Sequence, residues 1–221
     1  MTPPRLLSID WDAFMRDPAL DDWRPCTWPR QDASAVWYVR AAQGRATSRL
    51  SPSWAQLRRR VTLAADARQC VALDHGAILA WLATWPTPGH VLSLDAHHDA
   101  GYPADPPWDT GSRWVRDALR AGWTVTVCYP PWRSLTPEPT PPPALAGLSL
   151  HVDDGASLGR VDGVFWCRSD PWTHPAFDGT WARMVRAWGA SPLPTRPWGT
   201  PETRAAVRAI RGVLARRRGH P

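Results

Sequence analysis

The sequence of 221 residues contains no lysine, no asparagine, only two glutamates, and only three phenylalanines and three tyrosines. All 26 basic residues are therefore arginine. Lysine and asparagine have AT-rich codons, so their joint absence indicates a GC-rich coding sequence rather than adaptation to a ligand. For this reason the net charge of +6 does not by itself favour nucleic acid as a partner.

Other absences exclude whole classes of protein. No apolar run approaches the roughly 20 residues that span a bilayer, and the first residues lack the apolar stretch of a secretory signal. The four cysteines are widely spaced without a Cys-x-x-Cys pair, which excludes a disulfide scaffold and a structural zinc motif. There is no Gly-rich phosphate loop and no Gly-x-Ser-x-Gly motif. We therefore expect a cytoplasmic protein with reduced cysteines and no membrane partner.

The composition that remains is that of a globular protein, with 43% hydrophobic and 21% charged residues. Short apolar segments predict buried parallel strands at 5–9, 69–73, 90–94, 123–128, 148–152 and 163–167. Helical patterns at 76–85 and 113–121 alternate with these strands. The sequence therefore predicts a three-layer α/β/α fold with a mostly parallel sheet, in one domain over residues 1–221.

Two further segments have a distinct composition. Residues 130–147 are predicted to form a Pro-rich loop, either a surface linker or the rim of a site, because seven of the first 14 residues are proline. Residues 200–221 are predicted to form a C-terminal helix and a basic tail. Arg204, Arg208 and Arg211 fall on one face of that helix, which is expected to be solvated, with an anion or RNA contact as the alternative.

Polar residues with metal-binding chemistry follow three of the predicted strands. They are Asp10 and Asp12, then Asp74 and His75, and then Asp95, His97 and Asp99. In an extended chain, residues at i, i+2 and i+4 point the same way, so Asp95, His97 and Asp99 can converge on one point, and Asp10 and Asp12 can do likewise. Because ligands bind beyond the carboxyl ends of parallel strands, we expect the three groups to form one site.

The charges in this site predict two divalent cations. Four aspartates bring four negative charges, and their mutual repulsion without cations would raise their pKa values. Carboxylates combined with two imidazoles favour two Mn²⁺ ions, with Fe²⁺ or Zn²⁺ as alternatives. The predicted ligands are Asp10, Asp12, His75, Asp95, His97 and Asp99.

These motifs resemble the ureohydrolase superfamily of arginase, agmatinase and the histone-deacetylase-like enzymes. The matching segments are Asp95-Ala-His97-His98-Asp99, Ser8-Ile-Asp10-Trp-Asp12 and Asp74-His75. The segments at 97–102 and 164–169 and the Trp172-Thr-His-Pro sequence look like the arginase-related branch that includes the peptide arginases. In arginases the Ser-x-Asp-x-Asp segment comes late in the chain, whereas here it comes first, which looks like a circular permutation.

The resemblance implies an arginase-like fold and a ligand set in which Asp10 and Asp95 bridge two Mn²⁺ ions. His75 and Asp99 would complete one ion, and Asp12 and His97 the other. The implied reaction is hydrolysis of a C–N bond by a metal-bridging hydroxide. The implied substrate is a guanidinium group such as that of arginine, free or within a peptide, giving ornithine and urea.

Other residues are candidates for roles around the metals. Asp99 could orient the nucleophile, and His174, followed by His98, could deliver a proton to the leaving amine. The substrate glutamate of arginases has no counterpart after a strand, so Asp170 is the candidate anchor for a cationic substrate, with a turn role as the alternative. Trp172 could stack on such a cation.

Two other functions compete with a dinuclear hydrolase. A single-zinc amidohydrolase of the deacetylase type would use a subset of the same ligands on an acyl amide. A non-catalytic nucleic-acid-binding module would use arginine and the 16 tryptophans instead. The number of bound metal ions distinguishes the dinuclear hydrolase from the single-zinc amidohydrolase. A steep salt dependence of oligonucleotide binding would indicate the nucleic-acid-binding module. The oligomeric state is left open.

Overall fold

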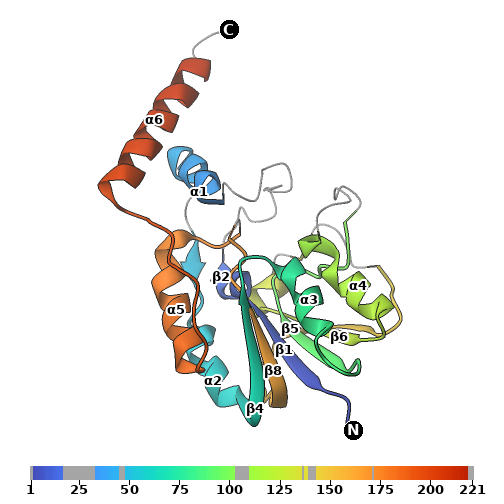
Figure 1. Ribbon diagram of the computed structural model, residues 1–221. Helices are drawn as coiled ribbons and strands as arrows, with labels where there is room; N and C mark the ends of the chain where they lie inside the picture. The colour runs from blue at the N-terminus through green and yellow to red at the C-terminus, as the bar shows by residue number, and fades with distance from the viewer. Residues whose placement is uncertain are drawn as a thin grey trace.

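A six-stranded parallel sheet forms the centre of the protein (Figure 1). The computed structural model describes residues 2–16, 33–44, 48–102, 110–135, 137–138, 143–170 and 172–218. The strand order is β4-β8-β1-β5-β6-β7, and every neighbouring pair is parallel. The strands are β1 (Arg5–Asp10), β4 (Val61–Ala72), β5 (His90–Leu94), β6 (Thr124–Tyr129), β7 (Leu148–Val152) and β8 (Gly159–Cys167).

All six predicted strands are confirmed, but two of them begin earlier than predicted. β4 begins at Val61 rather than at 69, and β8 begins at Gly159 rather than at 163. The added residues of the two strands pair with each other, across a register shift between Leu63 and Arg68. This part of β4 lies at the edge of the sheet and alternates polar with apolar residues, so it lacks the continuous apolar run that identified the buried strands.

Helices cover both faces of the sheet, which confirms the three-layer α/β/α fold. α2 (Leu57–Arg60) and α5 (Asp178–Ala187) pack on one face, and α3 (Ile78–Leu82) and α4 (Trp114–Arg120) pack on the other (Figure 1). Short 3-10 helices occupy Trp11–Phe14, Pro52–Gln56, His75–Ala77, Gly111–Arg113, Pro131–Ser134 and Pro175–Phe177. The predicted helices at 76–85 and 113–121 therefore each consist of a 3-10 turn followed by a shorter α-helix.

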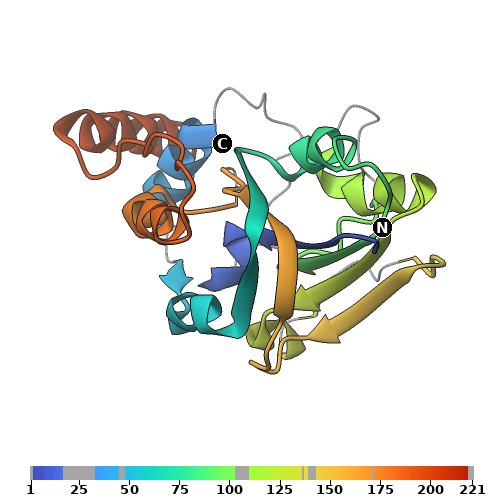
Figure 2. The same cartoon turned by 60° about the horizontal axis from the view of Figure 1, so that its bottom comes forward.

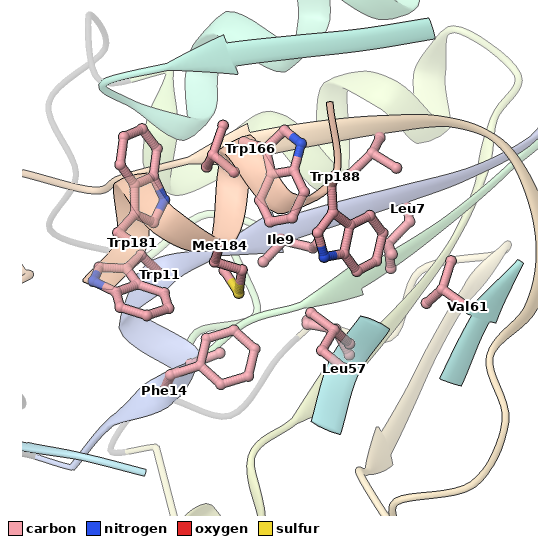
Figure 3. Packing of buried hydrophobic residues seen from close by; sticks show 14 of the residues in the cluster. Leu7, Ile9, Trp11, Phe14, Leu57, Val61, Trp166, Trp181, Met184 and Trp188 are labelled. Carbon is pink, nitrogen blue, oxygen red and sulfur yellow. The ribbon is translucent and has the colours of Figure 1, made fainter. Parts of the chain in front are cut away.

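Tryptophan fills much of the core. Alternate residues of β1 enter opposite faces, Leu7 toward α5 and Leu6 toward α3 and α4. Figure 3 shows the cluster on the α5 face, where several indole rings pack on β1 and β8. The labelled tryptophans there are Trp11, Trp166, Trp181 and Trp188, and all are buried. On the opposite face Trp81, Trp114 and Trp123 are also buried, so core packing on both faces accounts for much of the high tryptophan content.

The remaining elements lie outside these layers. The predicted C-terminal helix is confirmed as α6 (Pro201–Arg218), which packs against α1 (Ala33–Ala42). β2 (Met15–Arg16) and β3 (Arg49–Leu50) form a separate antiparallel pair. The Pro-rich segment contains one 3-10 turn, and its residues 136 and 139–142 lie outside the described part, as do 219–221 of the tail. Within the described residues, no helix is both long enough and apolar enough to cross a membrane.

Candidate metal centre

The predicted ligands meet at the carboxyl edge of four neighbouring strands. Asp10 ends β1, Asp95 directly follows β5, and His75 lies beyond the end of β4. The order β4-β8-β1-β5 makes these strand ends adjacent. Parallel pairing therefore places residues from distant parts of the sequence at one point, as expected for a ligand site in an α/β sheet.

The imidazole of His75 lies at the centre of the first cluster. Its Nδ1 atom lies 3.1 Å from Oδ2 of Asp10, 3.0 Å from Oδ2 of Asp95 and 3.1 Å from Oδ2 of Asp99. Its other nitrogen, Nε2, lies 2.7 Å from Oγ of Ser8. Among the described residues Nδ1 has no hydrogen-bond partner of acceptable geometry, although it is buried. Three carboxylate oxygens thus converge on one nitrogen at ion-pair distance, and none of the three contacts has the geometry of a hydrogen bond.

A second cluster is built around His97. Its Nδ1 atom lies 2.9 Å from Oδ2 of Asp12 and 3.9 Å from Oδ1 of Asp95. One ligand atom from each of the three residues lies within 4.8 Å of the others. Asp95 belongs to both clusters, so all six predicted ligands lie in two groups that share a carboxylate.

Each aspartate of the two clusters is also held by a donor outside the cluster centre. The backbone N–H of Asp12 donates to Oδ1 of Asp10 at 3.1 Å, and that of His97 donates to Oδ1 of Asp95 at 2.8 Å. Asp12 accepts from the N–H of Ala96 at 3.2 Å. Donors of this kind fix the direction in which a ligand points, which raises its affinity for a cation.

Two side chains that donate to the cluster come from neighbouring elements. Nε1 of Trp114 donates to Oδ2 of Asp99 at 2.9 Å, and the Ser169 hydroxyl donates to Oδ2 of Asp10. Asp99 and Ser169 are also the described non-glycine residues with positive φ, at 47° and 50°. L-residues adopt this left-handed conformation at an energetic cost, and it concentrates at functional sites. Here it turns both side chains toward the cluster.

Burial and charge perturb the ligands strongly. Burial, followed by repulsion from Asp99 and Asp10, raises the pKa of Asp95 well above its ordinary value. Burial alone would lower the pKa of His97, but the Asp12 carboxylate outweighs it and raises that pKa to about 10. His75 behaves in the same way, because the carboxylates around it raise its pKa well above the ordinary value despite burial.

These residues fit a divalent cation. Four acidic side chains and two histidines share a buried volume, and no arginine of the described residues forms an ion pair with any of the four acids. Four buried carboxylates outnumber the two imidazoles, and this excess of negative charge is costly unless a cation compensates it. The buried Asp and His clusters can therefore hold a metal ion. Cys167 forms a third group with Asp10 and His75, which the sequence did not indicate.

The two histidines predicted as proton donors lie in other surroundings. His98 is fully buried, its Nδ1 accepts from the N–H of Ala100 at 3.0 Å, and its ring stacks on Tyr102. Nδ1 of His174 accepts from the N–H of Ala176 and caps the 3-10 turn that follows it. The His174 ring packs between Trp37 and Trp198, with centroids 4.7 and 4.6 Å away. Both histidines thus contribute to local structure, and their role as proton donors stays a prediction.

The two predicted substrate-binding residues lie in different surroundings. Asp170 is paired with Arg168 through both carboxylate oxygens, and Arg196 lies 3.8 Å away. Its charge is therefore compensated within the protein, as in the alternative role of a turn residue, and its role as the anchor for a cation stays a prediction. Trp172 packs on His97 with ring centroids 5.0 Å apart and is partly exposed. Trp172 therefore borders the second cluster, and its stacking on a cationic substrate stays a prediction.

Glu138 is the residue near this site that the sequence analysis did not assign. It comes from the Pro-rich segment and accepts hydrogen bonds from the N–H of His98, at 3.1 Å, and from the hydroxyls of Tyr102 and Tyr129. Its negative charge contributes to the raised pKa of His97. The segment is thus a rim element. The one feature of the sequence that could have drawn attention to Glu138 is that the chain contains only two glutamates.

Comparison with known proteins leaves the family open. No model of a known protein family matches the chain, and neither the curated proteins nor the solved structures include a match. The resemblance to the ureohydrolases therefore rests on the short motifs alone.

Proposed function

We propose that this protein is a metal-dependent hydrolase of the ureohydrolase type, which cleaves a C–N bond at a site holding two Mn²⁺ ions. The observation that carries the proposal is the position of His75 Nδ1, on which three carboxylate oxygens converge at 3.0 to 3.1 Å, none of them with the geometry of a hydrogen bond. The second cluster, which shares Asp95 with the first, supports two ions rather than one. Asp10, Asp95, His75 and Asp99 would hold one ion, and Asp12, His97 and Asp95 the other.

Two bound divalent cations would supply a nucleophile at neutral pH and stabilise the negative charge that develops as the C–N bond breaks. The protein supplies the fixed geometry. Ser8, Trp114 and Ser169 orient the ligands, and burial of the aspartates excludes competing water. These contacts hold the charged groups in place before a substrate arrives, which is the main protein contribution to this type of catalysis.

The rim of the site supports a cationic substrate such as a guanidinium group. Glu138 places a carboxylate beside His97, and the indole of Trp172 lies against the same ring. A carboxylate and an aromatic face both attract a planar cation. With Asp170 bound to Arg168, Glu138 is the carboxylate at this rim that would favour a cation over an acyl group.

One observation favours a single-zinc amidohydrolase as the second candidate. His75, Asp95 and Asp99 form a complete three-residue group by themselves, and Cys167 lies close to His75 and Asp10. A site of one imidazole, two carboxylates and a nearby thiol suits one Zn²⁺ ion.

The proposal is tested by metal content and by product release. The purified protein is loaded with Mn²⁺, its metal content is measured by elemental analysis, and urea release is assayed from arginine, agmatine and arginyl peptides. Two ions per chain and urea release that is lost in Asp95→Ala, but kept in the exposed Asp66→Ala control, are expected. One Zn²⁺ with release of an acyl group supports the second candidate. A chain that retains no transition metal contradicts both.

A further inference from the structure

The net charge of the protein is concentrated at its C-terminal end. Residues 1–200 contain 20 arginines and 19 acidic residues, a net charge of +1, whereas residues 201–221 contain six arginines and one glutamate, a net charge of +5. A GC-rich coding sequence raises arginine everywhere in the chain. It does not explain why acidic residues balance arginine in the body and are nearly absent from α6.

Three of these arginines form one face of α6. Arg204, Arg208 and Arg211 follow the i, i+4, i+7 spacing that aligns side chains on one side of a helix, and all three are exposed. In the described part of the chain none of them forms an ion pair. Arg204 donates to the carbonyl of Gly199, and Arg211 lies 3.5 Å from the carbonyl of Ala41. The three charges therefore have no acidic partner along about 10 Å of helix.

The arginines of the protein body are used differently. Arg168 and Arg196 are buried, and each is bonded to aspartate. Arg60 is paired with Asp153. These three arginines of the body thus carry an acidic partner, and those of the α6 face do not. Like charges on one helix repel one another, so the α6 face gains no ion-pair stabilisation within the fold.

The position of α6 leaves this face open to a large partner. α6 projects from the sheet domain and lies beside α1 in both views (Figures 1 and 2). Its apolar residues Val207 and Ile210 are half-buried, while the arginine face is exposed. A helix that lies in a membrane surface needs its apolar face free to enter the lipid. α1 packs against α6, and Val207 and Ile210 are half-buried while Val213 is exposed, so little continuous apolar surface is free to enter lipid, which favours a polyanion in solution over an anionic membrane.

We propose that the face formed by Arg204, Arg208 and Arg211 binds the phosphodiester backbone of a nucleic acid. Guanidinium groups match phosphate oxygens in two-pronged hydrogen bonds, and they lose less hydration than ammonium groups do. Successive arginines on this face lie about 6 Å and about 4.5 Å apart along the helix axis, so three can contact one run of phosphates. Phosphate contacts carry no sequence information, so the binding is independent of base sequence.

The test measures binding of the full chain to a short labelled DNA duplex by fluorescence anisotropy, between about 50 and 200 mM salt. Three phosphate contacts predict that log K falls with log salt with a slope of about −3. Replacing Arg204, Arg208 and Arg211 together with Gln keeps good helix formers on the surface and is expected to reduce that slope by about three. A single-stranded RNA in a parallel titration shows which form of the backbone binds more tightly.

A matched control removes the same charge from the protein body. Arg160, Arg183 and Arg186 are exposed and lie outside α6, and their combined replacement with Gln is expected to keep most of the affinity. Equal loss in the two triple variants, absence of binding at low salt, or binding to phosphatidylserine vesicles without binding to nucleic acid overturns the proposal. Metal content is measured on the same α6 variant and should match the wild type, so this proposal and the metal centre can fail separately.

Discussion

Ser8 and His75 are joined by a hydrogen bond of 2.7 Å between Oγ and Nε2, which turns Nδ1 of the imidazole toward three carboxylates. Ser8 lies in the middle of β1 and is fully buried between strands β5 and β8. A cation at Nδ1 requires the proton of the ring to be on Nε2, where it donates to Ser8. The serine thus fixes the orientation that a metal ligand needs, and its hydroxyl oxygen can accept the proton on Nε2.

Replacing Ser8 with Ala is therefore expected to weaken metal binding although no ligand is removed. Loss of a partner that orients a metal-bound histidine typically lowers affinity by about 10- to 100-fold. The affinity for Mn²⁺ is measured by competition with a chelating dye. Ser93 offers a matched control, because it is the register neighbour of Ser8 on β5, is equally buried, and has no hydrogen-bond partner among the described residues. Similar affinities in both variants would contradict the role of Ser8.

Binding of Mn²⁺ is expected to stabilise the fold as a whole. A ligand at about 100 times its Kd adds about 2.7 kcal/mol to the free energy of unfolding. For a chain of this size each kcal/mol raises Tm by about 2–4 °C, so the rise is about 5–11 °C. Calorimetry with and without Mn²⁺ measures it, and treatment with EDTA should reverse it. An unchanged Tm would show that the buried cluster does not bind the ion.

Replacing Asp95 with Asn is expected to have opposite effects on the metal-free and the metal-loaded protein. The pKa of Asp95 is raised well above 3.8 by burial and by Asp99 and Asp10. The folded state therefore binds the Asp95 proton more tightly than the unfolded state does. This proton contributes to the free energy of unfolding below pH 3.8, and that contribution is lost as the pH rises through the raised pKa. Above its raised pKa the ionised side chain therefore opposes folding. The metal-free variant should be at least as stable as the wild type.

The same variant should lose the response to Mn²⁺, because Asp95 belongs to both clusters. Urea unfolding of the two proteins with and without Mn²⁺ measures both effects. Asp66→Asn, at an exposed position of β4, is expected to change neither the metal-free stability nor the Mn²⁺ response. A metal-free Asp95→Asn protein that is markedly less stable than the wild type would mean that the carboxylate has a structural role.

Much of this architecture could be predicted from the sequence. The buried strands appear as unbroken apolar runs, and the polar residues that follow them mark the carboxyl edge of the sheet. The convergence of His75 with Asp10 and Asp95 follows from parallel pairing of β4, β8, β1 and β5, although the sequence does not contain the strand order itself. The polar residues at the ends of the apolar runs were therefore enough to predict the ligands. The strand order of the sheet brings these residues together.

Two kinds of feature could not be found in this way. α5 carries Trp181, Met184 and Val185 at helical spacing, and Trp188 follows as its C-cap, but arginines between these apolar residues obscured the pattern. The position of Glu138 depends on how a proline-rich segment folds back on Tyr102 and Tyr129, and no local periodicity encodes that path. Asp170 pairs with Arg168, only two residues away, but the sequence alone does not show whether the Asp170 carboxylate is free or paired.

Replacing Asp170 with Asn is expected to lower stability and leave the metal site intact. The substitution breaks the two-pronged pair with Arg168, whose guanidinium is buried and also contacts the carbonyl of Pro194. Hydrogen bonds to charged groups contribute about 1.5–3 kcal/mol, which sets the expected loss in the free energy of unfolding. The rise in Tm caused by Mn²⁺ should equal that of the wild type. A stable variant with altered substrate preference would support Asp170 as a substrate anchor.

Replacing Glu138 with Ala is expected to destabilise the rim. The substitution leaves the hydroxyls of Tyr102 and Tyr129 and the backbone N–H of His98 without their acceptor. Unsatisfied buried donors cost about 1–3 kcal/mol each, and because Glu138 is half-buried, water offsets part of that loss. The three donors together would then cost about 3 kcal/mol of the free energy of unfolding, the lower end of their summed range, as measured by urea unfolding. Removing the carboxylate beside His97 should also raise KM for a cationic substrate.

The only other glutamate in the chain provides the control. Glu202 lies exposed in the first turn of α6, so Glu202→Ala should leave KM unchanged. Glu138→Gln separates the two roles of Glu138, because the amide oxygen still accepts from one of the tyrosines while the charge is lost. It is expected to recover part of the stability but not the KM. If Gln restored both, the carboxylate would hold the Pro-rich segment in place without attracting a cation.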